Sequence, residues 1–232
     1  SSLESTDEQP IVGSVSAPTS EEIKYRAYGS FSSQNRAVTI QDYQSLIYQM
    51  PPMFGAVKRA NVIKDPDSNK RNLNIYVMSE DSNGYLANSN QTLKNNIKTW
   101  LSNYKMLNDT VDILDGRIVN VGIEFEAISD INFSKFEVLA QAKKDLVTEL
   151  GTVKYDMGEP FRVSDILKVL KDVDGLLDVT NVRIFRRTGA RYSSFFYNLD
   201  TNLTPDGRLI NIPENAVFEI KYPNADIIGT IV

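Results

Sequence analysis

The chain contains no cysteine and no histidine among its 232 residues. It therefore has no disulfide, no thiol nucleophile and none of the usual zinc sites, and it lacks the commonest general base. No apolar run reaches the roughly 20 residues that a membrane-spanning helix needs, and Ser1 to Glu8 show no signal-peptide pattern. These absences exclude many enzyme classes, and we expect no membrane association. Because the chain starts with Ser1 rather than Met, we interpret it as a fragment of a longer protein.

The remaining composition is that of a folded globular protein. Hydrophobic residues make up 41% of the chain and charged residues 24%, which is enough apolar material for a real core. The net charge of −5 argues against a chain whose main task is to coat nucleic acid. The length suits two domains of roughly 100 residues each. We predict an arm with a short helix over 1–30, a first α+β module over 31–130 and a second over 131–232.

Hydrophobic periodicity predicts alternating strands and helices. The predicted strands cover 56–64, 73–78, 119–127 and 177–185, the first two forming a hairpin that turns at 65–69. The predicted helices cover 40–50, 90–104, 135–150 and 164–173, and Gly151 and Gly175 are expected to stop the last two. In the third helix the predicted buried face consists of Phe136, Leu139, Ala142, Leu146, Val147 and Leu150. This order of elements predicts an α+β fold of helices packed on antiparallel or mixed sheets.

The most informative segment runs from Asn35 to Tyr43 and reads NRAVTIQDY. Thr39 is a predicted helix N-cap, and Asp42 places a carboxylate in the first turn, where the helix dipole favours negative charge. The helix must end before the pair Pro51-Pro52. Gly55 follows, and then an apolar strand.

This order of capped helix, proline stop, glycine and strand closely resembles baseplate-J-type wedge proteins of contractile-tailed phages, above all their T-even-type members. The specific residues are Arg36 to Thr39, Asp42 with Tyr43, and Pro52 to Val57. Family members have Pro-Gly-Val directly, whereas here Met53 and Phe54 intervene and Ala56 precedes Val57.

The resemblance implies a structural, non-enzymatic subunit of the baseplate wedge, of which this chain is a C-terminal part. Such a late protein would join copies of itself and other wedge or tail proteins into the ring around the tail tube. It would be present in the host cytoplasm during tail assembly and in the virion tail baseplate afterwards. A related contractile injection apparatus would carry the same motif.

Candidate sites for chemistry fail on spacing. Asp65 to Asn69 and Ser79 to Gly84 imitate the start of a calcium loop, but both lack the bidentate Glu at position twelve. Glu124 and Glu126 share one strand face and could form the carboxylate pair of a hydrolase, although a solvated strand face explains them more simply. We expect no metal, no cofactor and no enzymatic activity.

One segment combines arginine and aromatic side chains, the types enriched at protein interfaces. As a protein interface it would contact another copy or a neighbouring tail protein. Alternatively, the aromatics fill the second core while the arginines are solvated, and the sequence favours neither reading over the other. Binding of single-stranded nucleic acid ranks behind both because the chain is acidic. This Arg–aromatic cluster consists of Arg183, Arg186, Arg187, Arg191, Tyr192, Phe195, Phe196 and Tyr197.

Overall fold

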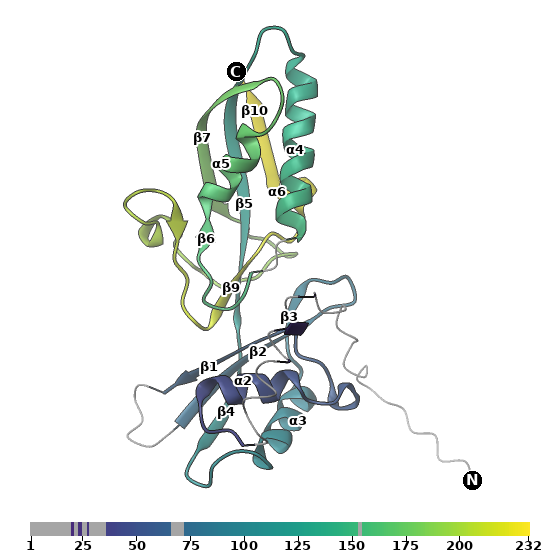
Figure 1. Ribbon diagram of the computed structural model, residues 1–232, viewed down its shortest axis with the longest axis vertical. Coiled ribbons are helices and arrows are strands. Elements are labelled where there is room, and N and C mark those ends of the chain that lie inside the picture. The colour runs from purple at the N-terminus through teal and green to yellow at the C-terminus, as the bar shows by residue number, and fades with distance from the viewer. Residues whose placement is uncertain (1–19, 21–22, 25–26, 28–35, 66–71, 153–154) are drawn as a thin grey trace, which may run out of the picture. The chain divides into compact units, whose positions relative to one another are not determined.

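The structure is a computed structural model that divides the chain into two compact units, Ser1–Gly116 (unit 1) and Arg117–Val232 (unit 2). It describes residues 20, 23, 24, 27, 36–65, 72–152 and 155–232. Each unit packs helices on a mixed sheet, so the predicted α+β fold is confirmed (Figure 1). The division falls before the predicted boundary at 130/131, because the strand predicted over 119–127 pairs with strands from the second half of the chain. Most of the predicted arm and of the turn at 65–69 lies outside the described residues.

The sheet of unit 1 is built around β2 (Asn72–Glu80). β1 (Arg59–Lys64) pairs antiparallel with it, which confirms the predicted hairpin. β4 (Thr110–Asp115) and β3 (Leu86–Asn88) pair with successive stretches of β2, the first parallel and the second antiparallel. Sequence periodicity did not identify β4, whose parallel partner is distant in the chain.

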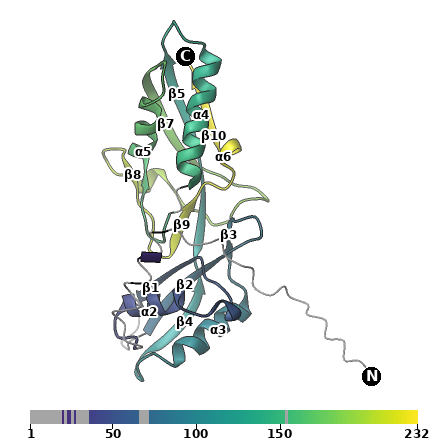
Figure 2. The same cartoon turned by 45° about the vertical axis from the view of Figure 1, so that its right-hand side comes forward.

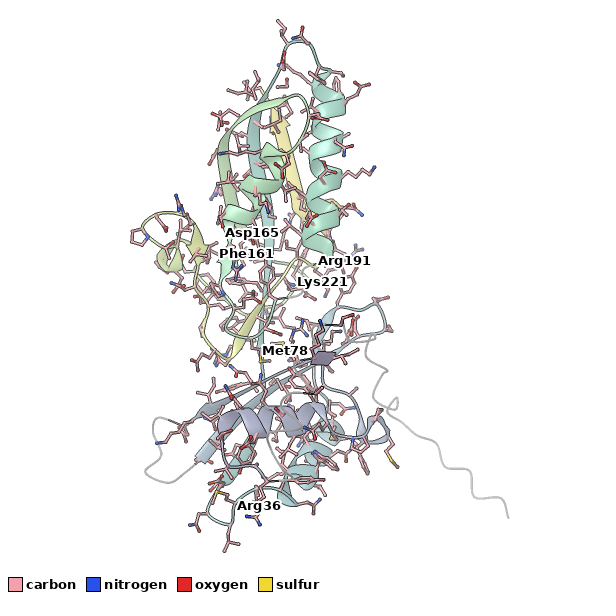
Figure 3. All side chains as sticks on the ribbon, in the orientation of Figure 1. Arg36, Met78, Phe161, Asp165, Arg191 and Lys221 are labelled. Atoms are coloured by element: carbon pink, nitrogen blue, oxygen red, sulfur yellow. The ribbon has the colours of Figure 1, made fainter. Side chains whose placement is uncertain are left out.

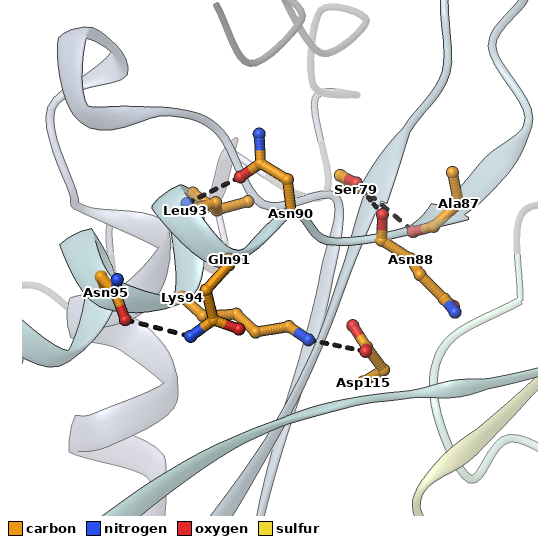
Figure 4. A network of polar contacts seen from close by, with 9 residues as sticks. All are labelled: Ser79, Ala87, Asn88, Asn90, Gln91, Leu93, Lys94, Asn95 and Asp115. Carbon is orange, nitrogen blue, oxygen red and sulfur yellow. Dashed lines mark hydrogen bonds and ion pairs between the residues drawn. The ribbon is translucent and has the colours of Figure 1, made fainter. Parts of the chain in front are cut away.

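Two helices, α2 (Ile40–Tyr48) and α3 (Gln91–Ser102), supply the apolar cover of this sheet (Figure 2). Alternate residues of β2 point toward them, as a period of two requires, and the core residues of β2 are Leu73, Ile75 and Val77. Asn90 caps α3, since its Oδ1 accepts the Leu93 N–H at 2.7 Å. The Lys94 ammonium lies 2.6 Å from the carboxylate of Asp115 and ties the helix to β4 (Figure 4).

Unit 2 is built around the long strand β5 (Arg117–Ser129). β7 (Leu176–Arg186) pairs antiparallel with one edge of β5, and β10 (Ile227–Ile231) pairs parallel with the other edge. β9 (Ala216–Glu219) pairs parallel with the first residues of β5. The register of β7 shifts twice, which leaves Leu177 and Thr180 without an opposite residue on β5. Such bulges turn the extra side chain away from its regular direction.

The helices α4 (Lys135–Thr152) and α5 (Val163–Lys171) pack on β10 and β7 and on each other. The alternate residues of β5 from Val119 to Ala127 are fully buried, whereas Glu124 and Glu126 between them are exposed. The opposite face of the sheet is therefore solvated there. The smaller elements are η1 (Pro52–Phe54), β6 (Phe161–Arg162), η2 (Asp200–Asn202), β8 (Leu209–Ile210) and α6 (Pro223–Asp226).

The buried stripe of α4 differs from the predicted one. Val138, Ala142, Leu146 and Leu150 are buried at helical spacing, whereas Phe136 is 85% exposed. Because each helical residue turns by about 100°, a side chain two positions before Val138 points to the opposite side of the helix. The prediction that Phe136 is buried is wrong. Gly151 was also expected to stop this helix, but α4 continues to Thr152.

Candidate protein-interaction surfaces

The segment that carries the family resemblance leads into helix α2 of unit 1. Thr39 Oγ1 accepts the Asp42 N–H at 3.1 Å, and the Asp42 carboxylate accepts the N–H groups of Thr39 and Val38 at 2.8 and 3.1 Å. This is the predicted capping box, and the helix begins at Ile40 as predicted. The polar residues of the motif therefore fix the path of the chain into α2.

The same segment is joined to a distant loop by two buried contacts. Tyr43 is fully buried, and its hydroxyl donates to the carboxylate of buried Asp109 at 2.6 Å. Ala37, also fully buried, donates its N–H to the carbonyl of Tyr104 at 3.0 Å. The motif thus joins the start of α2 to the chain that follows α3. Arg36, by contrast, is exposed (Figure 3).

The inserted Met53 and Phe54 form the turn of η1 at the proline stop. Gly55 closes this turn with φ at +109°, a backbone conformation that only glycine adopts without strain. The carbonyl of Phe54 accepts a hydrogen bond from Asn96 of α3 at 2.7 Å. The insertion lengthens the Pro-Gly-Val element but leaves glycine at the position that needs it.

Within the Arg–aromatic cluster, one group of side chains serves the fold of unit 2. Asp226 is fully buried and lies 2.8 Å from Arg187 Nε in an ion pair. Its carboxylate also accepts hydrogen bonds from the hydroxyl of Tyr192 at 2.7 Å and from the backbone N–H of Tyr222 at 2.9 Å. Arg187 further donates to the carbonyl of Ala225 at 2.6 Å. Arg187 and Tyr192 thus neutralise and solvate a buried carboxylate from another segment.

Three tyrosines of unit 2 hold their protons more tightly than free tyrosine does. Burial raises the pKa of Tyr192, and its hydrogen bond to the negative Asp226 adds to the effect. Burial also raises the pKa of Tyr197 and, most strongly, that of Tyr155, where the negative charge of Asp165 acts in the same direction. All three are expected to be neutral hydroxyls at ordinary pH.

The cluster also contains aromatics that pack within the unit. The hydroxyl of Tyr197 donates to the carbonyl of Asn211 at 2.7 Å, and its ring meets the buried ring of Phe218 edge-on. Phe195 stacks on Tyr197 with ring centroids 6.5 Å apart. Arg186 donates to the carbonyl of Phe195 at 3.0 Å. These contacts fix the segment after β7 against the core.

Three members of the cluster remain open to solvent. Phe196 is 70% exposed under the guanidinium of Arg186, whose Cζ lies 4.8 Å from the ring centroid. Arg183 is exposed on β7 opposite Glu124, and Arg191 is exposed in the loop that follows β7 (Figure 3). An interface at this cluster would therefore rest on Arg183, Arg191 and Phe196. The eight residues grouped from the sequence are thus divided into five half-buried and three exposed side chains.

A second set of exposed apolar side chains lies near the turn at the end of unit 2 where β5 passes into α4; Figure 1 shows this turn. Its side chains come from the end of β5, the following turn, the first turn of α4 and the first bulge of β7. We call it the apolar tip, and it consists of Ile128 (39% exposed), Ile131 (97%), Phe133 (49%), Phe136 (85%) and Leu177 (66%). The sequence-based predictions did not include these exposed side chains. The signal was the position of Phe136 off the buried stripe of its helix.

The apolar tip is held in place by backbone contacts. Asp130 donates its N–H to the carbonyl of Gly175 at 2.9 Å, and Phe133 donates to the carbonyl of Asp130 at 3.1 Å. Gly175 has φ at +82°, and a Cβ built there would lie 2.6 Å from the ring of Phe133. The ring therefore packs directly against the glycine backbone. The turn that carries Ile131 and Phe133 is joined to the start of β7.

The candidate chemical sites that the structure describes lie in different units, Ser79 to Gly84 in unit 1 and the pair Glu124 and Glu126 in unit 2. Ser79 to Gly84 cover the end of β2 and the turn toward β3, where Asp81 accepts hydrogen bonds from the N–H groups of Asn83 and Tyr85. Among the described residues no group of three or more His, Cys, Asp or Glu side chains could hold a metal ion. A groove of about 340 Å³ beside α4 contains no carboxylate among its lining residues, which are Lys143, Lys144, Thr148 and Asn224 with the apolar Ala140, Val147 and Ile227. In the described part of the chain no helix is long and apolar enough to span a bilayer.

Comparison with solved structures finds several similar chains. No family model matches the sequence, and no curated protein matches it. A chain in the 6-fold symmetrised cryo-EM structure of the anti-feeding prophage (AFP) baseplate is similar, with a TM-score of 0.49 and 15% sequence identity. The match covers 88% of the present chain and 42% of that chain, so the present chain spans less than half of its length.

Proposed function

We propose that this chain is a structural subunit of a contractile-tail baseplate wedge, which joins copies of itself and other wedge proteins around the tail tube. The observation that carries the proposal is the segment Arg36 to Tyr43 with the turn at Pro52 to Val57. Its residues resemble the baseplate-J-type motif, and the hydrogen bonds of Thr39, Asp42 and Tyr43 fix the path of the chain. The motif is thereby a structural device rather than a reactive site.

The exposed surfaces support binding as the work of this protein. Unit 2 presents large apolar side chains at the apolar tip and, separately, the exposed arginines and Phe196 of the Arg–aromatic cluster. Aromatic and arginine side chains are the types that supply most of the binding energy at protein interfaces. Catalysis has no part in the proposal.

Amine cross-linking followed by mass spectrometry tests the proposal on intact contractile-tailed particles that contain the full protein. The exposed lysines Lys135, Lys144 and Lys168 give reporters on α4 and α5 of unit 2. We expect cross-links between these lysines and other baseplate proteins, together with links between copies of the chain. Absence of the protein from purified particles, or links to head proteins alone, would overturn the proposal.

A further inference from the structure

We infer that the outer edge of β10, together with the groove beside α4, binds an extended, acidic segment of a different protein as an added β-strand. The inference goes beyond the proposed function, which does not say how any partner is held. It concerns unit 2 alone and uses neither the apolar tip nor the Arg–aromatic cluster.

β10 is an edge strand of the sheet in unit 2. The strand order is β10-β5-β7, and among the described strands β5 alone pairs with β10. Val232 donates its N–H to the carbonyl of Ala127 in β5 at 2.9 Å. Because successive residues of a strand point their N–H and C=O groups to opposite edges, Thr230 also faces β5. The N–H and C=O groups of Gly229 and Ile231 therefore point away from β5, toward the outer edge.

The two edges of this sheet differ in how they are protected. Sheet edges are usually blocked by charged residues, prolines or bulges, because an open edge pairs readily with another chain. β7, at the opposite edge, has two register shifts and charged residues that include Asp178 and Arg183. The stretch from Ile227 to Val232 reads IIGTIV, with no charge and no proline, and the register of β10 on β5 is regular. Such an edge is suited to strand addition, in which backbone hydrogen bonds hold an extended segment.

The groove beside α4 lies next to this edge. Ile227, the first residue of β10, lines the groove together with Ala140 and Val147 of α4. The helix packs on β10, and both lie side by side in Figures 1 and 2. Gly229 faces the same helix, since a Cβ built there would lie 2.8 Å from Leu139. Side chains of an added strand that point to this side of the sheet would therefore enter the groove, which has an apolar lining and a volume of about 340 Å³.

The charge of the groove favours an acidic segment. Lys143 and Lys144 line it, and no carboxylate does. Asp145, the next residue in the chain, instead accepts a hydrogen bond from Gln141 at 2.8 Å. Lys143 is half-buried, so the attraction between its ammonium and a bound carboxylate would be less screened by water than on an open surface. Two ammonium groups without a carboxylate attract a segment that carries Glu or Asp and repel a basic one.

Hydrogen exchange read by NMR on the 232-residue chain tests whether the edge is open. The outward amides of Gly229 and Ile231 should exchange about 100-fold faster than those of Ile228 and Thr230, which face β5. Equal protection of the four amides in dilute solution would mean that a segment of the same chain covers the edge. Protection that appears only with rising concentration would mean that a second copy covers it. Either result would overturn the inference.

A synthetic peptide then tests binding. The probe alternates valine and threonine, and two valines at one end are replaced by glutamate, so that apolar and acidic side chains share one face. Its counterpart carries lysine in place of glutamate. At saturation the glutamate peptide should slow exchange of Gly229 and Ile231 by about tenfold or more. The lysine peptide should bind about fivefold more weakly, because repulsion replaces two ion pairs. No slowing with the glutamate peptide at millimolar concentration, or equal affinity of the two peptides, would overturn the inference.

Variants separate the charge of the groove from the hydrogen bonding of the edge. Lys143→Glu with Lys144→Glu should reverse the preference between the two peptides. The matched control is Lys168→Glu with Lys171→Glu, which changes the net charge equally at exposed positions of α5 and should leave the preference unaltered. Ile231→Pro removes an outward N–H, which an edge strand tolerates, and should raise the peptide Kd about tenfold.

Circular dichroism checks that each variant is folded. An equal shift of preference in the α5 control and the groove variant would overturn the inference. None of these results bears on whether the protein lies in a baseplate, which the cross-links in particles test separately.

Discussion

Replacement of Asp226 by alanine should destabilise unit 2 strongly, because this carboxylate is fully buried and neutralises Arg187. Removing one partner of a buried ion pair costs about 3–5 kcal/mol. The side chain of Arg187 is 25% exposed, so water takes up part of the lost interaction, and we expect about 2–4 kcal/mol. The hydroxyl of Tyr192 and the N–H of Tyr222 lose their acceptor in the same variant.

Hydrogen exchange followed by mass spectrometry measures this effect separately in each unit. A loss of about 2–4 kcal/mol corresponds to exchange that is faster by roughly 30-fold to 1,000-fold in the most protected amides, since 1.4 kcal/mol is tenfold. The change should appear in peptides from β5 and β7 and be absent from β1 and β2. Asp226→Asn keeps the shape and one acceptor, so it should give a smaller change.

The control for this prediction is Arg183→Ala, which removes an exposed arginine of β7. Surface substitutions of this kind stay within about 0.5 kcal/mol, so exchange in β5 and β7 should change by less than about threefold. If Asp226→Ala changed exchange no more than Arg183→Ala does, the internal role assigned to Arg187 and Tyr192 would be refuted.

Three further predictions concern other parts of the fold. Tyr43→Phe removes the buried hydrogen bond to Asp109 and should lower the free energy of unfolding of unit 1 by about 1–3 kcal/mol. Urea unfolding followed by the fluorescence of the single tryptophan measures this change, and an unchanged urea midpoint would contradict the prediction. In Gly175→Ala the new Cβ would clash with the ring of Phe133, and alanine is strained at the positive φ of this position. The substitution should therefore lower the stability of unit 2 by about 1–3 kcal/mol, which hydrogen exchange would show as faster exchange of the amides at the start of β7. Unaltered protection of these amides would show that the ring is not fixed. The pKa of Tyr155 is raised by burial, so the unfolded chain releases this proton first, near pH 10, and stability that is complete below that pH is lost above it. Tyr155→Phe should therefore make the thermal midpoint fall less steeply between pH 9 and 11, and an identical slope would contradict this.

The sequence predicted those elements whose signal is local. The capping box of α2 depends on residues three apart, and the period of two in β5 is visible along one strand. The boundary between the units could not be predicted in the same way. It depends on pairings such as Asn120 with Glu219, and no property of residues near 130 reveals them.

For the candidate interface, the sequence identified residue types but not their contacts. Arg187 and Arg183 look alike in the sequence. In the structure, however, Arg187 forms an ion pair with the buried carboxylate of Asp226 in α6, whereas Arg183 is exposed to solvent. The apolar tip was within reach of sequence reasoning. Phe136 stands two positions before Val138, and a stricter helical phase would have placed it outside the buried stripe.

The proposed place of this protein in a contractile-tail baseplate can be observed by electron microscopy. Intact contractile-tailed particles would be labelled with gold-conjugated antibodies raised against this chain. We expect gold at the baseplate end of the tail, around the tube, in several copies per particle. Gold along the sheath or on the head, or unlabelled particles in preparations where the chain is detected by immunoblot, would contradict it.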